Sequence, residues 1–349
     1  MQKKLCFLDL FAGAGGLSEG FIQAGFTPIA HVESDSAACF TLKTRMAYHW
    51  LKSVGQEEIY IDYLNKKIDR NKLYSSVPIE VEQSVINKEI AQESIADIFK
   101  TIDLRLQGRK LDLIVGGPPC QAYSLVGRSR STNRMIGDKR NYLYIFYAEF
   151  LKHYNPDYFV FENVTGLLSA KDHDGNSHFN SMRKLFFDSG YETEYRVLSA
   201  NEYGVPQTRK RIILVGRKGN STGFYPEPKK WNPGVTVEEV FRNLPAIKDG
   251  GGQVSPCQTK PYLGSWLHEA CVLNTTMPVT WHQARPNTEQ DLEIYRIVVE
   301  LWNLKRKRLE YDDLPERLKT HQNRKAFVDR FKVVAGDLSA SHTVVAHLS

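Results

Sequence analysis

The sequence has few cysteines, and none of them is spaced like a metal or redox motif. Its 349 residues include five, which are Cys6, Cys39, Cys120, Cys257 and Cys271. No two form a CxxC pair, so neither a thiolate metal site nor a redox disulfide is expected. The odd number and the wide spacing favour reduced thiols in a cytosol-like compartment.

Long apolar runs and a large excess of one charge are also missing. The apolar stretch after Met1–Lys4 ends at Asp9, which is too soon for a signal peptide or a membrane span. Hydrophobic residues at 42% and charged residues at 25% are ordinary for a soluble globular protein. The net charge of +6 favours a polyanionic partner only slightly. We therefore expect no membrane partner, and composition alone leaves the function open.

The chain begins with the pattern of a doubly wound α/β domain. Leu5–Leu10 is predicted to be a buried strand, and the glycine-rich turn Phe11–Leu17 leads into a helix that ends near Gly25. Pro28–Val32 is predicted to be a second strand, and Glu33 follows it. A strand, a glycine loop, a helix and a strand followed by an acid predict a Rossmann-like sheet.

Three further buried strands are predicted at Leu111–Val115, Tyr158–Phe161 and Arg211–Val215. The first two carry polar residues at their carboxyl ends, where open α/β sheets bind ligands. The lysine-rich stretch from about 45 to 93 is poorly periodic, and we interpret it as a mostly helical insertion.

The composition changes after Gly216, because residues 223–261 are rich in proline and glycine. We predict one domain over 1–222 and a second, smaller, irregular domain over 223–349. Thr288–Lys307 is predicted to be a helix, and its apolar residues at helical spacing are Leu292, Tyr295, Val299 and Trp302. The basic residues Lys305–Arg308 and Arg324–Lys325 fit phosphate contacts or an ordinary solvated surface equally well.

Two local patterns could carry chemistry. The glycines of Phe11–Leu17 allow a ligand close to the backbone, and an acid such as Glu33, about 20 residues further on, commonly binds ribose hydroxyls. The same pattern fits a tight turn with a solvated glutamate. In Gly116–Ser124, two prolines stiffen the loop that delivers Cys120. For an isolated cysteine, a buried and unreactive thiol would be the commoner interpretation.

Taken together and in order, the motifs resemble those of the cytosine-5 DNA methyltransferase family. Gly117-Pro-Pro-Cys-Gln121 is similar to the family's nucleophile motif, and Glu162-Asn-Val164 is similar to its Glu-Asn-Val motif. The other segments that match are Phe11–Leu17, Glu33, Asp97-Ile98, Asp138–Leu143 and Gln207–Arg211. The resemblance covers residues 5–216, and His282–Asn287 and Ser341–His347 are similar to parts of the family's target-reading half.

The resemblance implies a methyltransferase domain with S-adenosylmethionine as methyl donor, S-adenosylhomocysteine as product and no metal. A target-recognition domain would follow. The implied cofactor-binding residues are Phe11, Ala12, Gly13, Gly15, Gly16, Leu17, Glu33, Asp97, Ile98, Pro118 and Leu143. The implied partner is double-stranded DNA, and the implied setting is a bacterial restriction–modification system in the cytosol or nucleoid.

The resemblance also implies a role for each catalytic residue. The thiolate of Cys120 would attack C6 of a flipped-out cytosine. Glu162 would bond N3 and the exocyclic amine of that base. Arg209 and Arg211 would hold the base carbonyl and the DNA backbone and support Glu162. The base that removes the C5 proton is not identified by the sequence.

The chain departs from the family pattern in several places. Ala96 replaces the glycine that usually precedes the Asp-Ile pair, and two segments expected near the carboxyl end, Arg-Glu-Ala-x-Arg-x-Gln-x-Phe-Pro and Gly-Asn-x-Val-Pro-Pro, are absent. We therefore expect an incomplete target-recognition domain, from a truncated or split enzyme whose partner is a complementary C-terminal chain. Exposed apolar surface near Leu17 and Phe21, and weak methylation, would follow. A tRNA cytosine-5 methyltransferase and an inactive DNA-binding remnant are the alternatives.

Overall fold

The computed structural model describes residues 4–119, 142–172, 174–257, 277–320 and 331–344. The chain forms two compact units. The first contains Met1–Tyr63, Ile68–Ser199 and Lys210–Lys229, and the second contains Leu64–Lys67, Ala200–Arg209 and Lys230–Ser349. The domain boundary predicted between residues 222 and 223 stays a prediction.

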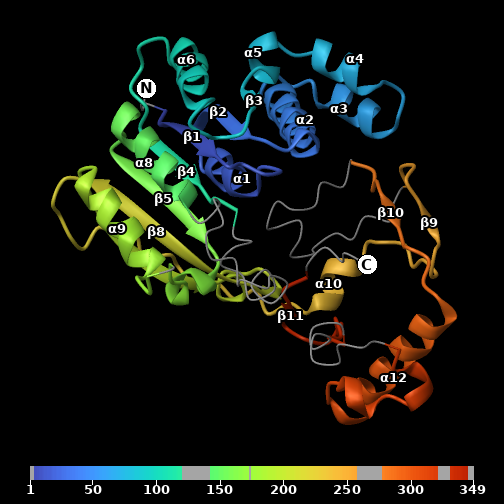
Figure 1. The fold of residues 1–349 in the computed structure, drawn as a ribbon. Coiled ribbons are helices and arrows are strands. Elements are labelled where there is room, and N and C mark those ends of the chain that lie inside the picture. The colour runs from blue at the N-terminus through green and yellow to red at the C-terminus, as the bar shows by residue number, and fades with distance from the viewer. Residues whose placement is uncertain (1–3, 120–141, 173, 258–276, 321–330, 345–349) are drawn as a thin grey trace. The chain divides into compact units, whose positions relative to one another are not determined.

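A seven-stranded sheet forms the centre of the first unit (Figure 1). Its order is β3-β2-β1-β4-β5-β8-β6, and only β8 runs antiparallel to its neighbours. The strands are β1 (Cys6–Leu10), β2 (Thr27–Glu33), β3 (Val85–Asn87), β4 (Leu113–Gly116), β5 (Tyr158–Asn163), β6 (Tyr191–Ser199) and β8 (Lys210–Lys218). The strand order reverses between β1 and β4, which is the place where such sheets bind ligands. The predicted doubly wound α/β fold is confirmed.

Helices cover both faces of this sheet. On one face lie α6 (Ile95–Leu106), α8 (Leu143–Tyr154) and α9 (His178–Asp188), and on the other lie α1 (Gly16–Gln23) and α2 (Ser36–Ser53). Alternation along β1 explains the two cores, because Leu8 packs in the cluster with α6 and α8 while Phe7 packs with α1.

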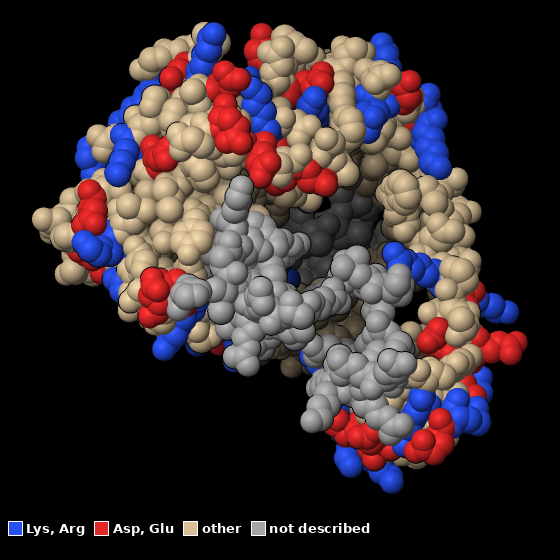
Figure 2. Space-filling model, viewed as in Figure 1, with Lys and Arg blue, Asp and Glu red and all other residues tan. Residues whose placement is uncertain are grey.

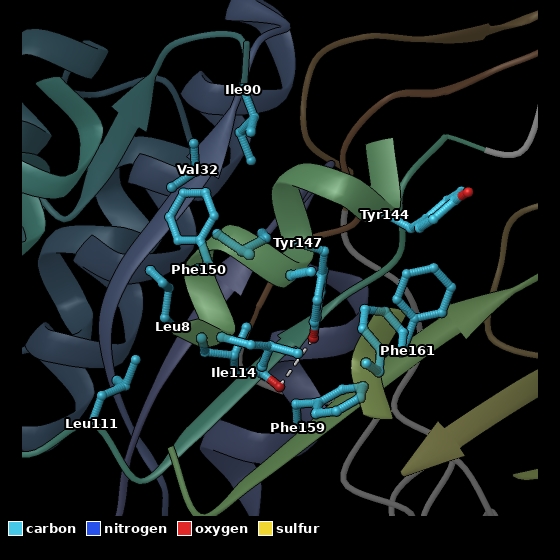
Figure 3. Close-up of a cluster of buried hydrophobic side chains, with 14 of the residues drawn as sticks. Leu8, Val32, Ile90, Leu111, Ile114, Tyr144, Tyr147, Phe150, Phe159 and Phe161 are labelled. Atoms are coloured by element: carbon cyan, nitrogen blue, oxygen red, sulfur yellow. Dashed lines mark hydrogen bonds between the residues drawn. The ribbon is translucent and has the colours of Figure 1, made fainter. Parts of the chain in front are cut away.

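The buried Tyr147 of α8 ties its helix to two strands (Figure 3). Its hydroxyl lies 3.2 Å from the carbonyl oxygen of Ile114 on β4 and 3.1 Å from that of Val160 on β5. A buried hydroxyl needs such partners, because an unpaired polar group in the core is costly. The contact therefore fixes α8 against the strands whose ends carry the polar motifs.

The region predicted as a helical insertion is only partly one. It holds three short helices, which are α3 (Glu57–Leu64), α4 (Arg70–Ser75) and α5 (Ile79–Glu82). However, α2 extends into it as far as Ser53, and Val85–Asn87 forms β3 of the main sheet. The bounds of the insertion, about 45–93, stay a prediction, and β3 was not predicted because a three-residue strand is too short to show a period.

The described residues of the second unit have little regular structure beyond one long helix. Its elements include α10 (Val237–Phe241), α12 (Glu289–Lys305) and two small ribbons, in which β7 (Gln207–Thr208) pairs with β11 (Ser341–His342) and β9 (Gly252–Gln253) with β10 (His282–Gln283). The 3-10 helices among the described residues are η2 (Thr165–Ser169), η3 (Ala200–Glu202), η4 (Tyr311–Asp313) and η5 (Glu316–Leu318).

Helix α12 was predicted, and its amino-terminal cap is the side chain of Thr288, which accepts a hydrogen bond from the amide of Asp291. Its buried side is formed by Ile294 and Val298, with Ile297 and Leu301 packed beside them. The apolar residues that marked the helix in the sequence lie elsewhere, since Leu292, Tyr295 and Val299 are exposed. A helix with apolar residues on two sides shows its period in the sequence but not which side is covered.

None of the helices in the described part of the chain is both long and apolar enough to cross a membrane.

Two ionisable side chains are buried side by side in the sheet. Asp9 on β1 pairs in register with His31 on β2, and they are 1% and 0% exposed. Burial, with a smaller contribution from the charge of Glu33, raises the pKa of Asp9 to about 7 against a hydrogen bond from Ser18. Burial and the positive charges of Arg105 and His49 lower the pKa of His31 to about 4. His31 is therefore neutral at physiological pH.

The pKa of Asp9 predicts a pH-dependent effect of Asp9→Asn. An aspartate in the unfolded chain loses its proton near pH 4, whereas folded Asp9 keeps it to about pH 7, so this group's contribution to stability falls as pH rises through that window. Asparagine does not titrate. The free energy of unfolding of the variant, measured against wild type by denaturant titration, should rise between pH 4.5 and pH 7.5. His31 is common to both proteins and cancels, and a constant difference would contradict the prediction.

Candidate active site

The glycine-rich loop begins where β1 ends, beside the reversal of strand order (Figure 1). Phe11 has φ 56°, an unusual value for a residue with a side chain, and Gly13 and Gly15 have φ 54° and 83°. The amide of Ala12 donates to the carbonyl of Val32 at 3.1 Å, and that of Gly15 to the carbonyl of Ala12 at 2.9 Å. The strained turn is held in place by β2, and such strain is often found at binding sites.

The structure brings Glu33 to this loop. One carboxylate oxygen, Oε2, accepts the amide of Gly13 at 2.8 Å, and the other, Oε1, accepts the amides of Ser34 and Asp35 at 2.8 Å each. A carboxylate has about four acceptor positions, so these bonds leave capacity for the hydroxyl groups of a ligand. The predicted loop and the predicted acid therefore form one site.

The amino terminus of α1 faces the same loop. Its first residue is Gly16, and no side chain caps it, because the preceding residue is Gly15. Uncapped amides at a helix start can bind polar or anionic groups. Leu17 and Phe21 are half-buried against Phe7 and its neighbours, so the apolar surface expected there is only partly exposed.

The two motif-bearing strands β4 and β5 come very close together at their carboxyl ends. A Cβ atom added to Gly117 would lie 2.6 Å from Oε2 of Glu162 and 2.9 Å from its carbonyl oxygen, so only glycine fits there. The side chain of Asn163 adds a second tie, because its Nδ2 donates to the carbonyl of Pro118 at 3.3 Å. Cys120, the predicted nucleophile, follows directly and lies outside the described residues.

An ion pair joins Glu162 to Arg211. Nε of Arg211 lies 2.7 Å from Oε1 of Glu162, and the two side chains are 22% and 30% exposed. The arginine also donates from Nη1 to the carbonyl of Lys210 at 2.8 Å. Because β8 runs antiparallel to β5, its first residues lie beside the end of β5 that carries Glu162. Charge-assisted bonds of this kind fix the carboxylate in one orientation.

Other predicted residues lie elsewhere in the fold. Asp97 and Ile98 are in the first turns of α6, where Asp97 pairs with Lys88 at 3.0 Å and Ile98 is fully buried in the core. Arg209 belongs to the second unit and follows β7, and its carbonyl accepts the amide of Ala200 at 3.0 Å. Pro118 is buried and Leu143 is half-buried at the start of α8.

Two residues were missed by sequence reasoning. Asn87 ends β3 beside Glu33, and its Nδ2 donates to the carbonyls of Glu33 and Ser34 at 3.2 and 2.9 Å. It was missed because β3 was not predicted. Asn163 was quoted within its motif without a role. Its position at a strand end would have found it, because strand ends carry the sites of such sheets.

The described residues contain no group of three or more His, Cys, Asp or Glu side chains placed to hold a metal ion.

Basic and acidic side chains are interspersed on the face shown in Figure 2. In the second unit, Arg306 pairs with Asp337 at 2.7 Å and Arg317 pairs with Glu293. Arg324 and Lys325, for which phosphate contacts and a solvated surface were both left open, lie outside the described residues. The charge run of the sequence is therefore partly neutralised by its own neighbours.

Comparison with known proteins gives a consistent result. The family model for C-5 cytosine-specific DNA methylase matches residues 5–78 and 80–325. Type II methyltransferase M.Bpa9945I of Bacillus paralicheniformis is 37% identical, with 98% of this chain and 84% of the relative covered. Type II methyltransferase M.XorII of Xanthomonas oryzae pv. oryzae is 36% identical, with 68% of this chain and 46% of the relative covered.

A match was also found among the solved structures. The crystal structure of a putative DNA modification methyltransferase encoded within a prophage of E. coli has a TM-score of 0.49 and 24% identity, over 76% of this chain and 63% of that one. The family match covers most of the sequence and includes both halves of the site built above. This chain belongs to the C-5 cytosine-specific DNA methylase family of enzymes.

Proposed function

We propose that this chain transfers a methyl group from S-adenosylmethionine to C5 of a cytosine in a specific sequence of duplex DNA, within a restriction–modification system. The observation that carries the proposal is the junction of Gly117, Glu162 and Arg211, where a carboxylate held by an arginine lies at the start of the segment that contains Cys120. The type II methyltransferases among its relatives support the DNA substrate and do not favour the tRNA alternative.

The chemistry requires these residue types. C5 of cytosine is a poor nucleophile until a thiolate adds to C6 and turns the ring into an enamine. Cys120 would form that bond. Glu162 would hydrogen-bond N3 and the exocyclic amine, so that charge leaves the ring as sulfur adds. Arg211 keeps Glu162 oriented toward the strand ends, because the ion pair fixes its carboxylate. Arg209 would hold the base carbonyl and the DNA backbone.

The residues around the glycine loop fit S-adenosylmethionine, which supplies an electrophilic methyl group. The uncapped start of α1 and the amides of Phe11–Leu17 suit its polar methionine part, and Glu33 retains acceptor positions for its ribose hydroxyls. Asn87 holds the chain that follows Glu33 and would position the same acid. Ile98 is fully buried in the core, so an adenine contact in this region would require another side chain.

The reaction balances without a further reagent. The S–C6 bond would form, and C5 would take the methyl group as the bond of that group to the donor sulfur breaks, which leaves S-adenosylhomocysteine. Transfer of the C5 proton to water or to a basic side chain would then break the S–C6 bond and restore both the aromatic ring and the thiolate. Because C6 is hidden in the base stack, the nucleotide must first be flipped out of the duplex.

Covalent trapping tests the role of Cys120. A duplex that contains 5-fluorocytosine keeps the adduct, because fluorine at C5 cannot leave as a proton does. With S-adenosylmethionine present, wild type should form a complex that survives denaturing electrophoresis, and Cys120→Ala should form none. Cys257→Ala, which removes a half-buried free thiol of the second unit, is the matched control and should still trap. An inactive remnant would bind the duplex without forming the adduct.

Removing the acid of Glu162 should slow the reaction without weakening the cofactor site. Glu162→Gln loses the ion pair with Arg211 and cannot share a proton with N3, so the methyl transfer rate should fall by about 100-fold or more. The affinity for S-adenosylhomocysteine, measured by calorimetry, should be unchanged. Glu149→Gln on α8 is the control and should keep wild-type rates. Equal rates for both variants would remove Glu162 from the mechanism.

The cofactor role of Glu33 has a separate readout. Glu33→Gln keeps one acceptor but loses the charge, so S-adenosylhomocysteine should bind about tenfold more weakly. Calorimetry measures this without DNA. Glu82→Gln removes a carboxylate that pairs with Lys43 at 2.8 Å and should leave binding unchanged. If Glu33→Gln bound the product as tightly as wild type, the ribose assignment would fail.

A further inference from the structure

A two-stranded ribbon in the second unit is held by backbone hydrogen bonds that extend beyond β9 and β10. Besides β9 and β10, backbone bonds join Gly250 to Arg285, Gly251 to Ala284 and Cys257 to Val279. A Cβ atom on Gly252 would lie 2.2 Å from the carbonyl oxygen of His282, so the close approach of the strands requires glycine. The ribbon is thus a defined element within an otherwise irregular unit.

The pairing of this ribbon is irregular opposite Trp281. Three residues separate the paired positions Gln253 and Cys257 on one strand, but only two separate His282 and Val279 on the other. The extra residue therefore lies on the strand that faces Trp281, whose own amide donates to the carbonyl of Val254 at 3.5 Å. Trp281 has φ 58°, and its carbonyl accepts the amide of Gln283 at 3.0 Å. The backbone is therefore held in a conformation that costs free energy for a bulky residue.

This strained backbone displays an exposed indole. Trp281 is 76% exposed, whereas Trp231 of the same unit is 44% exposed and packs on Gly204, where an added Cβ would lie 2.2 Å from the ring. Trp231 therefore has a structural role, whereas no comparable packing contact is found for Trp281 among the described residues. A large apolar side chain that is both exposed and held by strain points to a binding partner.

The neighbours of Trp281 have side chains that can form hydrogen bonds to the edges of bases. Gln253, Gln283 and Arg285 are exposed on the same ribbon. Amide and guanidinium groups bond base edges, and a two-stranded ribbon fits the major groove. His282 anchors the ribbon, because its Nε2 lies 2.7 Å from the carbonyl of Pro245. The bond to Pro245 therefore fixes the ribbon, while the polar side chains named above and the indole of Trp281 stay exposed.

We infer that this ribbon reads the target sequence, with the indole of Trp281 packed against the bases of duplex DNA and Gln283 bonded to a base edge. Trp281 is then a specificity-determining residue. The inference rests on the proposed function, because it presumes a DNA substrate. It names the side chains that would make the contact in and beside His282–Asn287, a segment that the sequence only likened to part of the family's target-reading half.

Binding to selected duplexes tests the inference. Wild-type protein with S-adenosylhomocysteine is used to select labelled duplexes from a pool with a randomised core, and a scrambled duplex serves as the non-specific reference. Trp281→Ala should bind the selected duplex about tenfold or more weakly and the scrambled duplex almost normally. Trp281→Phe should recover most of the affinity. Leu304→Ala, which truncates a side chain that is 81% exposed on the same unit, is the matched control and should bind like wild type.

Each outcome decides the inference. Equal affinities of wild type and Trp281→Ala for the selected duplex would overturn it, as would an equal loss on both duplexes. If Trp281→Ala is unstable on thermal unfolding, Trp281→Phe still decides, since the selected duplex should quench more indole fluorescence in wild type than in that variant. If wild type selects no duplex and forms no trapped adduct, the proposed function fails. If wild type traps DNA but Trp281→Ala binds the selected duplex as tightly as wild type does, only the inference fails.

Discussion

The bond between Arg211 and Glu162 is the constraint on which the site depends. It exists because β8 enters the sheet antiparallel to β5, which places the start of one strand beside the end of the other. A parallel strand there would carry its first residue to the opposite edge of the sheet. Both side chains are largely covered, so loss of either partner would leave a charge without compensation in a poorly solvated position.

The same carboxylate sets the path of the segment before Cys120. Gly117 passes so close to Glu162 that no side chain fits between them, and Asn163 fixes the carbonyl of the next residue, Pro118. Two motifs that lie 45 residues apart in the sequence are therefore one structural unit. A change in either motif would move the other, which explains why a strand end with glycine, proline and a cysteine needs a glutamate and an asparagine beside it.

The sequence predicted the parts whose signals are local. The strand ends, the glycine loop and Glu33 were found because alternation, glycine and spacing are visible within a few residues. Features that depend on tertiary packing could not be predicted from local sequence patterns. β3 is too short to show a period, the burial of Ile98 in the core is not marked in its motif, and α12 has apolar residues on two sides. Contacts between distant segments decide the register of a strand and the side of a helix that is buried. No local sequence pattern shows these contacts.

Charge illustrates the same limit for the second unit. Phosphate contacts were one of two interpretations of the basic run Lys305–Arg308, yet Arg306 of that run already pairs with Asp337. An arginine in an ion pair adds less attraction for DNA than its formal charge suggests, because its partner repels the phosphates. Recognition of one sequence among many must then depend on groups that bond or pack against bases rather than on net charge. The described residues that combine exposure, a fixed backbone and the right chemistry lie on the ribbon around Trp281, away from the basic run of α12 in the sequence.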